Sequence, residues 1–182
     1  IQAERITQFN GAPSMVMQLL AQPGFDDPAL TGTLSGLGFG GAGLFQRVID
    51  ELQRRRPNSL SGVGFGLTET NGVGAAASGT LFAYKPHSAG VLSPIIDVRI
   101  ADAMGQSLPI GEQGEVWLRG VTIMQGYWRD PEATAAAMCE GWFRSGDVGY
   151  MDDEGFLFIV DRIKDVINRS GEKIAAAEVE SC

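Results

Sequence analysis

The chain has 182 residues, with 14 basic and 22 acidic side chains and a formal net charge of −8. Its content of 44% hydrophobic and 20% charged residues is typical of a folded globular protein rather than a disordered one. The negative charge argues against a nucleic-acid partner, because phosphate binding needs a basic face. No apolar run approaches the roughly 18 residues that a membrane-spanning helix needs, so we expect no span of that kind.

Two cysteines, Cys139 and Cys182, show neither metal-ligand spacing nor a pairing signature. We expect both to remain reduced in a cytoplasmic protein. The chain starts at Ile1 without a start signal for a helix or strand, and it stops just after a predicted helix start. We therefore expect it to be a piece of a longer protein.

The first part of the chain alternates predicted strands and helices. Apolar spacing together with Pro and Gly signals predicts helices over 13–22 and 44–55 and strands over 34–39 and 60–65. A strand–helix–strand order indicates the end of a parallel sheet that is covered by helices. Ligands of such sheets bind beyond the carboxyl ends of the strands, which is where 40–42 and 66–69 fall.

The second part of the chain has a different pattern. Alternating apolar residues and turn signals predict short strands over 96–100, 115–119, 142–144 and 156–160, as in an antiparallel barrel or sandwich. One helix interrupts them, with Asp130 as its N-cap, Pro131 at its first position and an Ala-rich run to Met138. We expect the tail of an α/β subdomain over 1–76, an antiparallel β-barrel-like subdomain over 77–160, and a hinge with the first residues of a small α+β domain over 161–182.

The stretch 64–72 reads Gly-Phe-Gly-Leu-Thr-Glu-Thr-Asn-Gly and follows a predicted strand. Glycine lets the backbone approach a ligand closely, and a threonine hydroxyl beside a glutamate carboxylate can bind a phosphate and its Mg²⁺. Taken alone, such a stretch is more often an ordinary loop. Three further motifs follow it in order: Arg-Ser-Gly-Asp at 144–147, Asp-Arg-Ile-Lys-Asp at 161–165 and Gly-Glu-Lys-Ile at 171–174.

This ordered set resembles the adenylate-forming superfamily and, within it, the AMP-forming acyl-CoA synthetases. The resemblance covers essentially the whole chain and includes Thr-Gln-Phe-Asn-Gly-Ala-Pro at 7–13, Gly-Gly-Ala at 40–42, Gly-Tyr-Trp-Arg-Asp-Pro-Glu-Ala-Thr at 126–134 and Glu-Val-Glu at 178–180. It implies a ligase that joins a fatty acid to CoA in two half-reactions. The carboxylate attacks the α-phosphate of ATP and releases pyrophosphate, and the CoA thiol then displaces AMP.

The resemblance also implies a site for ATP or AMP with Mg²⁺. Thr68 would donate its hydroxyl to the α-phosphate, and Glu69 would hold the Mg²⁺ that withdraws charge from the phosphates. The nucleotide would also contact Gly40, Gly41, Ala42, Gly64, Phe65, Gly66, Leu67, Asp147 and Ile159. Phe65, where relatives often have tyrosine, would stack on adenine, and Asp147 would accept both ribose hydroxyls.

Near the carboxyl end, Arg162 would bind ribose and phosphate oxygens with its planar fork of donors. By resemblance, Lys164 is the hinge about which a small C-terminal domain turns between the half-reactions. Gly171 begins a Gly-Glu-Lys loop that would reach the site when the thioester forms. Asn168 stands where several relatives have lysine, which leaves a catalytic role for that position in doubt.

Other interpretations of these residues remain open. Without the family pattern, Asp147 is typical of a turn or cap, and Arg162 and Lys164 are typical of solvated charges at a strand end. The acidic run 152–154 lacks the spacing of a calcium loop and indicates an exposed hairpin turn. The single histidine, His87, lies in a Pro/Gly loop and is assigned no role. We expect Trp117, Trp142, Phe156 and Phe158 to fill the core.

Two family elements have no counterpart in these residues: the Ser/Thr/Gly-rich phosphate loop and the C-terminal lysine that drives adenylation. We therefore expect the isolated chain to be inactive as a ligase. Two alternatives remain. One is an adenylate-forming enzyme that activates another carboxylate or hands the acyl group to a carrier protein. The other is a non-catalytic binding or structural module. The joint presence of Thr68, Glu69, Asp147 and Arg162 disfavours the module. Expected partners are the acid, ATP and CoA, with a homo-oligomer left open.

Overall fold

The computed structural model describes residues 1–40, 46–164, 167–169 and 172–174. They belong to two compact units. Unit 1 consists of Ile1–Phe65 and Ala76–Gly90, and unit 2 consists of Gly66–Ala75 and Val91–Cys182. The chain thus leaves unit 1 after Phe65, contributes one loop to unit 2, and returns to unit 1 before it enters unit 2 again. Among the described helices, none is long and apolar enough to cross a membrane.

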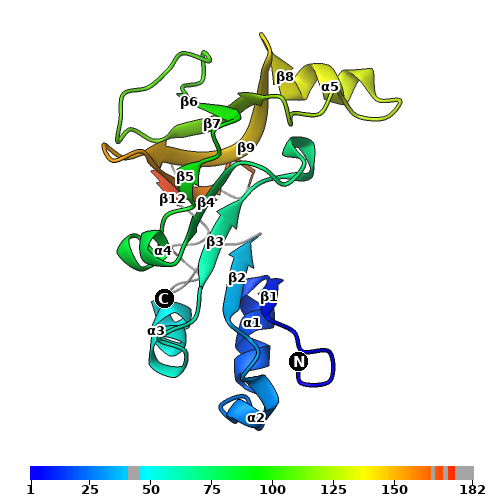
Figure 1. Ribbon diagram of the computed structural model, residues 1–182. Coiled ribbons are helices and arrows are strands. Elements are labelled where there is room, and N and C mark those ends of the chain that lie inside the picture. The colour runs from blue at the N-terminus through cyan, green and yellow to red at the C-terminus, as the bar shows by residue number, and fades with distance from the viewer. Residues whose placement is uncertain (41–45, 165–166, 170–171, 175–182) are drawn as a thin grey trace. The chain divides into compact units, whose positions relative to one another are not determined.

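Unit 1 is built on parallel strands (Figure 1). In sheet order these are β1 (Gln8–Gly11), β2 (Gly36–Gly40) and β3 (Gly62–Phe65). Strand β4 (Ala75–Ser78), whose last three residues belong to this unit, lies next to β3 and runs antiparallel to it, because the Gly79 N–H after β4 donates to the Ser61 carbonyl before β3. Parallel neighbours need a crossover connection, and helices supply it here. Helix α1 (Pro13–Leu20) follows β1, and α3 (Gln46–Arg55) follows β2. The predicted strand–helix–strand order is confirmed.

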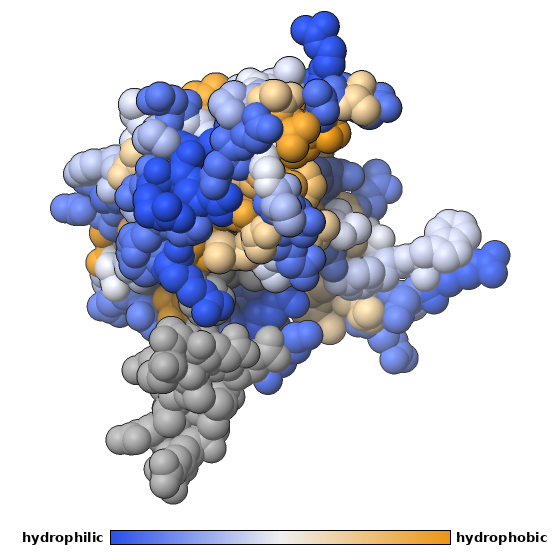
Figure 2. Space-filling model, turned by 90° about the horizontal axis from the view of Figure 1, so that it is seen from below, coloured by the Kyte–Doolittle hydropathy of each residue, from blue (hydrophilic) through white to orange (hydrophobic). Residues whose placement is uncertain are grey.

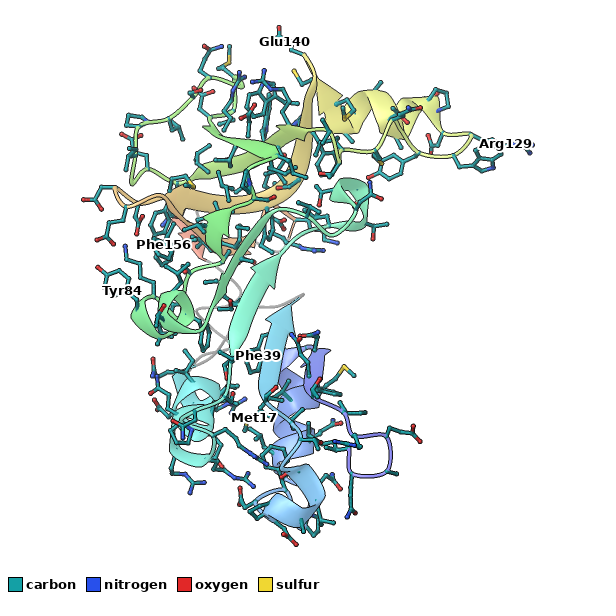
Figure 3. All side chains as sticks on the ribbon, viewed as in Figure 1. Met17, Phe39, Tyr84, Arg129, Glu140 and Phe156 are labelled. Carbon is teal, nitrogen blue, oxygen red and sulfur yellow. The ribbon has the colours of Figure 1, made fainter. Side chains whose placement is uncertain are left out.

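The core of unit 1 forms where α1 and α3 pack on the sheet. Its buried residues are Val16, Leu20, Phe25, Leu34, Leu37, Phe39, Val48 and Leu52, and Met17 packs against them from α1 (Figure 3). Two short helices complete the unit, α2 (Pro28–Thr31) and α4 (Thr80–Tyr84). Phe82 of α4 is buried and stacks on Phe39 of β2, with 6.4 Å between the ring centroids.

Unit 2 is built on antiparallel strands, as the sequence predicts. They pair in the order β6 (Ile96–Ala101), β7 (Gly114–Gly120), β9 (Trp142–Met151) and β10 (Phe156–Arg162), and β8 (Met138–Cys139) adds to β9. The short strand β5 (Gly90–Leu92) lies where the chain enters the unit. Helix α5 (Pro131–Ala137) precedes β8, and the Asp130 carboxylate caps it by accepting a hydrogen bond from the Ala133 N–H at 2.9 Å.

Three of the four aromatic residues expected in the core are buried there, namely Trp117, Trp142 and Phe156. Phe158 is an exception, because it is only half-buried and stacks on Tyr150 with 4.9 Å between ring centroids. The acidic run 152–154 forms the expected turn between β9 and β10. The Asp152 carboxylate accepts hydrogen bonds from the backbone N–H groups of Glu154 and Phe156, at 3.0 Å and 2.8 Å.

Beyond β10 the described residues form a small antiparallel pair of strands. It consists of β11 (Ile167–Arg169) and β12 (Glu172–Ile174). The predicted turn at 170–171 and the predicted helix start at 175–180 lie outside the described residues.

The surface seen in Figure 2 is mostly hydrophilic, with smaller hydrophobic areas between the polar side chains. The most exposed large apolar residues are Val121, Trp128 and Met104, at 86%, 85% and 83% of their full exposure. Single exposed apolar residues are normal on folded domains, so we assign them no role.

Candidate functional site

Unit 2 contains a cavity of about 740 Å³. Three separate segments line it, 66–69, 144–146 and 162–164, together with Glu115 and Ala136. A volume of this size accommodates a typical small-molecule ligand. The structure therefore brings together six of the predicted site residues: Gly66, Leu67, Thr68, Glu69, Arg162 and Lys164.

A tight turn presents the Thr-Glu pair to this cavity. Thr70 is fully buried, and its hydroxyl both accepts from the Leu67 N–H and donates to the Leu67 carbonyl, each at 3.0 Å. The Gly72 N–H also donates to the Leu67 carbonyl, at 2.8 Å. A Cβ on Gly66 would lie 2.4 Å from the Gly72 oxygen, so only glycine fits there. The turn leaves Thr68 exposed and Glu69 half-buried at the cavity.

The Glu69 side chain is held from one side by Tyr127. The Tyr127 hydroxyl donates to Oε1 of Glu69 at 2.8 Å, and this hydrogen bond raises the pKa of Tyr127 above its ordinary value. The backbone of Glu69 is fixed as well, because its carbonyl accepts from the Met124 N–H at 2.7 Å. The side chain and the backbone of Glu69 are thus each held by a hydrogen bond from the loop before α5.

A bulge in β9 shapes the Asp147 position. The pairing of β9 with β7 is regular up to Arg144 opposite Trp117 and resumes at Val148 opposite Glu115. Three residues, 145–147, therefore face a single residue of β7. Gly146 adopts a φ of +73°, which glycine tolerates best. Such bulges redirect side chains and are frequent next to active sites.

Asp147 is a nearly fully buried carboxylate, with an exposed fraction of 4%. Its Oδ1 lies 3.2 Å from Nε of Arg162, whose side chain is half-exposed. Burial raises the pKa of Asp147 above the ordinary value of 3.8, while the charge of Arg162 and hydrogen bonds from Arg162 and Ser145 oppose the rise. Removal from water therefore outweighs the ion pair when no ligand is bound.

A second charged pair, Glu115 and Arg144, lines the cavity without having been assigned a role from the sequence. The Arg144 guanidinium donates to Oε2 of Glu115 from Nε and Nη2, at 3.2 Å and 3.1 Å. The Trp117 indole N–H donates to the same oxygen at 2.8 Å. The Glu115 side chain is 10% exposed. The sequence offers one signal for the contact between Glu115 and Trp117. The two residues are two positions apart on a predicted strand, so their side chains lie on the same face of the sheet.

The remaining predicted site residues lie elsewhere or outside the described residues. In unit 1, Gly40 pairs directly with Gly64 at the ends of β2 and β3, and Phe65 follows, half-buried. Ile159 lies in β10 opposite Gly149 and is not among the described residues that line the cavity. Gly41 and Ala42, expected to contact adenine, and Gly171, expected in the loop that reaches the site when the thioester forms, fall outside the described residues.

The described residues contain no group of three or more His, Cys, Asp or Glu side chains that could hold a metal ion alone. Mg²⁺ usually binds through one or two carboxylates together with substrate phosphates and water. A single carboxylate, Glu69, beside the Thr68 hydroxyl fits this type of site. The donor set thus suits a Mg²⁺ ion that arrives with a nucleotide.

Residues 1–128 match the family model described as AMP-binding enzyme. The chain belongs to this family, within the adenylate-forming superfamily. Feruloyl-CoA synthase of an Amycolatopsis species is 39% identical over 188 positions, which cover 100% of this chain and 36% of the relative. The match includes both units described above.

Solved structures of relatives share the fold. O-succinylbenzoate CoA synthetase of Bacillus subtilis, in complex with ATP and a magnesium ion, matches with a TM-score of 0.83 and 28% identity, over 98% of this chain and 36% of that one. A fatty acyl CoA synthetase of Mycobacterium tuberculosis matches with a TM-score of 0.79 and 32% identity, over 98% and 35%. The chain spans about a third of the length of these relatives.

Proposed function

We propose that this chain is part of an AMP-forming acid–thiol ligase that activates a carboxylic acid with ATP and transfers the acyl group to CoA. The observation that carries the proposal is that one cavity gathers Thr68, Glu69, Arg162 and Lys164, with Asp147 held by Arg162. The family membership supports it, as do the names of the relatives, which include CoA synthetases for feruloyl, O-succinylbenzoate and fatty acyl groups.

The first half-reaction joins two anions, so the protein contributes mainly position and charge neutralisation. A carboxylate oxygen of the acid attacks the α-phosphorus of ATP, and the bond to pyrophosphate breaks with its electron pair. Thr68 and Arg162 would donate hydrogen bonds to the phosphate oxygens on which negative charge increases. Glu69 would hold Mg²⁺, which supplies charge withdrawal from the phosphates.

Asp147 would bind the ribose of the nucleotide. Two ribose hydroxyls can donate to a carboxylate, and hydrogen bonds to the charged form favour that form. Because burial raises the pKa of Asp147 in the ligand-free chain, nucleotide binding and ionisation of Asp147 would support each other. This coupling would explain why the protein has a buried carboxylate at this position, although burial of its charge destabilises the folded state.

The second half-reaction would use the residues after β10. The CoA sulfur attacks the acyl carbonyl, and the bond to AMP breaks, so AMP leaves. Lys164 would serve as the hinge, since it lies in the turn that follows Arg162, and Gly171 would belong to the loop that reaches the site in this state. The backbone before the hinge is fixed, because the Ile163 N–H donates to the Gly146 carbonyl at 2.8 Å.

The acid is proposed to be a fatty acid, with an aryl acid such as ferulic acid as the alternative that the 39% identical relative favours. The test uses the full-length protein with ATP, Mg²⁺, CoA and a panel of fatty and aryl acids. Acid-dependent pyrophosphate release and the mass of the CoA thioester are measured, with Asp147→Ala as the inactive variant and Asp153→Ala, at an exposed turn position, as its control.

The proposal predicts acid-dependent release by the full-length protein and by Asp153→Ala, and none by the 182-residue chain alone. Absence of release with every acid would contradict the ligase assignment. Release by the isolated chain would contradict its proposed inactivity.

A further inference from the structure

The loop before α5 is tied to the Thr-Glu turn at three points. The Tyr127 hydroxyl donates to Oε1 of Glu69 at 2.8 Å, and the Met124 N–H donates to the Glu69 carbonyl at 2.7 Å. The Asn71 side-chain amide donates to the Thr122 carbonyl at 2.8 Å. This loop carries the Gly-Tyr-Trp motif, which has no part in the function proposed above.

Helix α5 in turn fixes the backbone of Tyr127. The Tyr127 N–H donates to the Thr134 hydroxyl at 2.9 Å, and that hydroxyl donates to the Asp130 carbonyl at 2.8 Å. A Cβ on Gly126 would lie 2.8 Å from Cγ2 of Thr134, so a side chain there would disturb this contact. Arg129 lies at the outer end of this segment (Figure 3). The contacts with Thr134 and with Glu69 therefore meet at Tyr127, one at its backbone N–H and one at its hydroxyl.

We propose that Tyr127 is a positioning residue for Glu69: its hydroxyl, braced through Thr134, holds the carboxylate in the orientation that binds the Mg²⁺ of the nucleotide. With Oε1 engaged by the phenol, Oε2 is the oxygen offered to the cation. Hydrogen bonds of this kind orient ligand carboxylates in metal sites. The inference rests on the function proposed above.

The exposure of Tyr127 supports this role over simple packing. Its side chain is 38% exposed, so its ring is not needed to fill the core, yet its hydroxyl is engaged by the Glu69 carboxylate.

The test is the Mg²⁺ dependence of ATP binding in the full-length protein, compared with AMP binding in the absence of metal. Tyr127→Phe keeps the ring and removes the hydroxyl. It should raise the Mg²⁺ concentration for half-maximal ATP binding by about tenfold or more, the usual loss when such a partner is removed. The affinity for metal-free AMP should stay within about twofold, because AMP binding does not use the Glu69 carboxylate.

Tyr150→Phe is the matched control, since Tyr150 lies in the same unit and keeps its stacking on Phe158. Thr134→Val, which removes the brace, should shift the Mg²⁺ dependence in the same direction, and Thr134→Ser should restore it. These two variants keep the test decisive if Tyr127→Phe folds poorly.

An unchanged Mg²⁺ dependence in Tyr127→Phe and Thr134→Val would overturn the inference alone. An equal loss of ATP and AMP binding would also overturn it, because that result indicates a general structural role. A wild-type protein without Mg²⁺-dependent ATP binding would overturn the proposed function and this inference together.

Discussion

Arg162 stands directly opposite Asp147 because a bulge in β10 shifts the strand pairing by one residue. Ile159 pairs with Gly149, but Asp161 pairs with Val148, so one residue between them has no partner on β9. A shift of one residue along a strand exchanges the faces on which side chains lie. The bulge thus sets the contact of 3.2 Å between Nε of Arg162 and Oδ1 of Asp147.

The burial of Asp147 predicts an unusual pH dependence of stability. Its pKa is raised above 3.8 in the folded chain, so the folded state binds this proton more tightly than the unfolded state does. The resulting stabilisation is present below pH 3.8 and is lost as the pH rises through the folded pKa. Asp147→Asn stays neutral, so it should be at least as stable as the wild type at pH 7.

The measurement is denaturant unfolding of the 182-residue chain at pH 4 and pH 7. The advantage of Asp147→Asn should be larger at pH 7 than at pH 4. Asp153→Asn, which removes one charge from an exposed turn, is the control and should show no such change. If the wild type gains stability over Asp147→Asn as the pH rises, the burial argument is wrong.

Arg162→Lys tests whether the planar fork of donors matters beyond its charge. Lysine keeps the positive charge near Asp147 but cannot bind two oxygens in one plane. We expect the affinity of the full-length protein for AMP to fall by about tenfold, as for the loss of one hydrogen bond to a charged group. Calorimetric titration with AMP measures it. An affinity equal to that of the wild type would show that charge alone is sufficient.

Much of unit 1 could be predicted from the sequence because its elements have strong apolar periodicity. Helix α1 begins at Pro13 as predicted. In unit 2, α5 likewise begins after the Asp130 cap as predicted. Strands β1 (Gln8–Gly11) and β4 (Ala75–Ser78) were not predicted. Their sequences, Gln-Phe-Asn-Gly and Ala-Ala-Ala-Ser, carry little apolar alternation, so pairing with neighbours decides their structure.

The composition of the cavity was only partly predictable. The family motifs indicate Thr68, Glu69 and Arg162, and the structure brings these residues to one cavity. The ion pair between Glu115 and Arg144 depends on how β7 pairs with β9, and the register of that pairing changes between Glu115 and Trp117. No local pattern in the sequence determines such a change of register. The Tyr127–Glu69 contact joins residues 58 apart in the chain, which periodicity cannot reveal.

Two glycines of the Thr-Glu turn should differ in their tolerance of alanine. A Cβ on Gly66 would meet the Gly72 oxygen at 2.4 Å, whereas a Cβ on Gly72 would meet nothing within 4 Å. Gly72 has a φ of +74°, so Gly72→Ala should cost about 1–2 kcal/mol of unfolding free energy from backbone strain alone. Gly66→Ala should cost more and should also weaken ATP binding, because the turn must open.

Denaturant unfolding and ATP titration of both variants measure this difference. Equal costs for Gly66→Ala and Gly72→Ala would contradict the close approach inferred for Gly66.

Thr70→Val should reveal how far the buried hydroxyl supports the turn. Valine has a similar shape but leaves the Leu67 N–H without its side-chain acceptor. A buried donor that loses its partner costs about 1–3 kcal/mol, and this part-buried hydrogen bond should fall near the lower end of that range. We expect that loss in the unfolding free energy, with recovery of most of it in Thr70→Ser. A serine variant no better than the valine variant would assign the role of Thr70 to packing.

We propose that these residues form part of the site for an acyl-adenylate. Calorimetric titration of the full-length protein with a non-hydrolysable acyl-adenylate analogue, for the wild type and Asp147→Ala, tests this most directly. We expect the wild type to bind and the variant to bind at least about tenfold more weakly, since it loses hydrogen bonds between a charged group and the ribose. A wild type that does not bind, or a variant that binds equally well, would contradict the account.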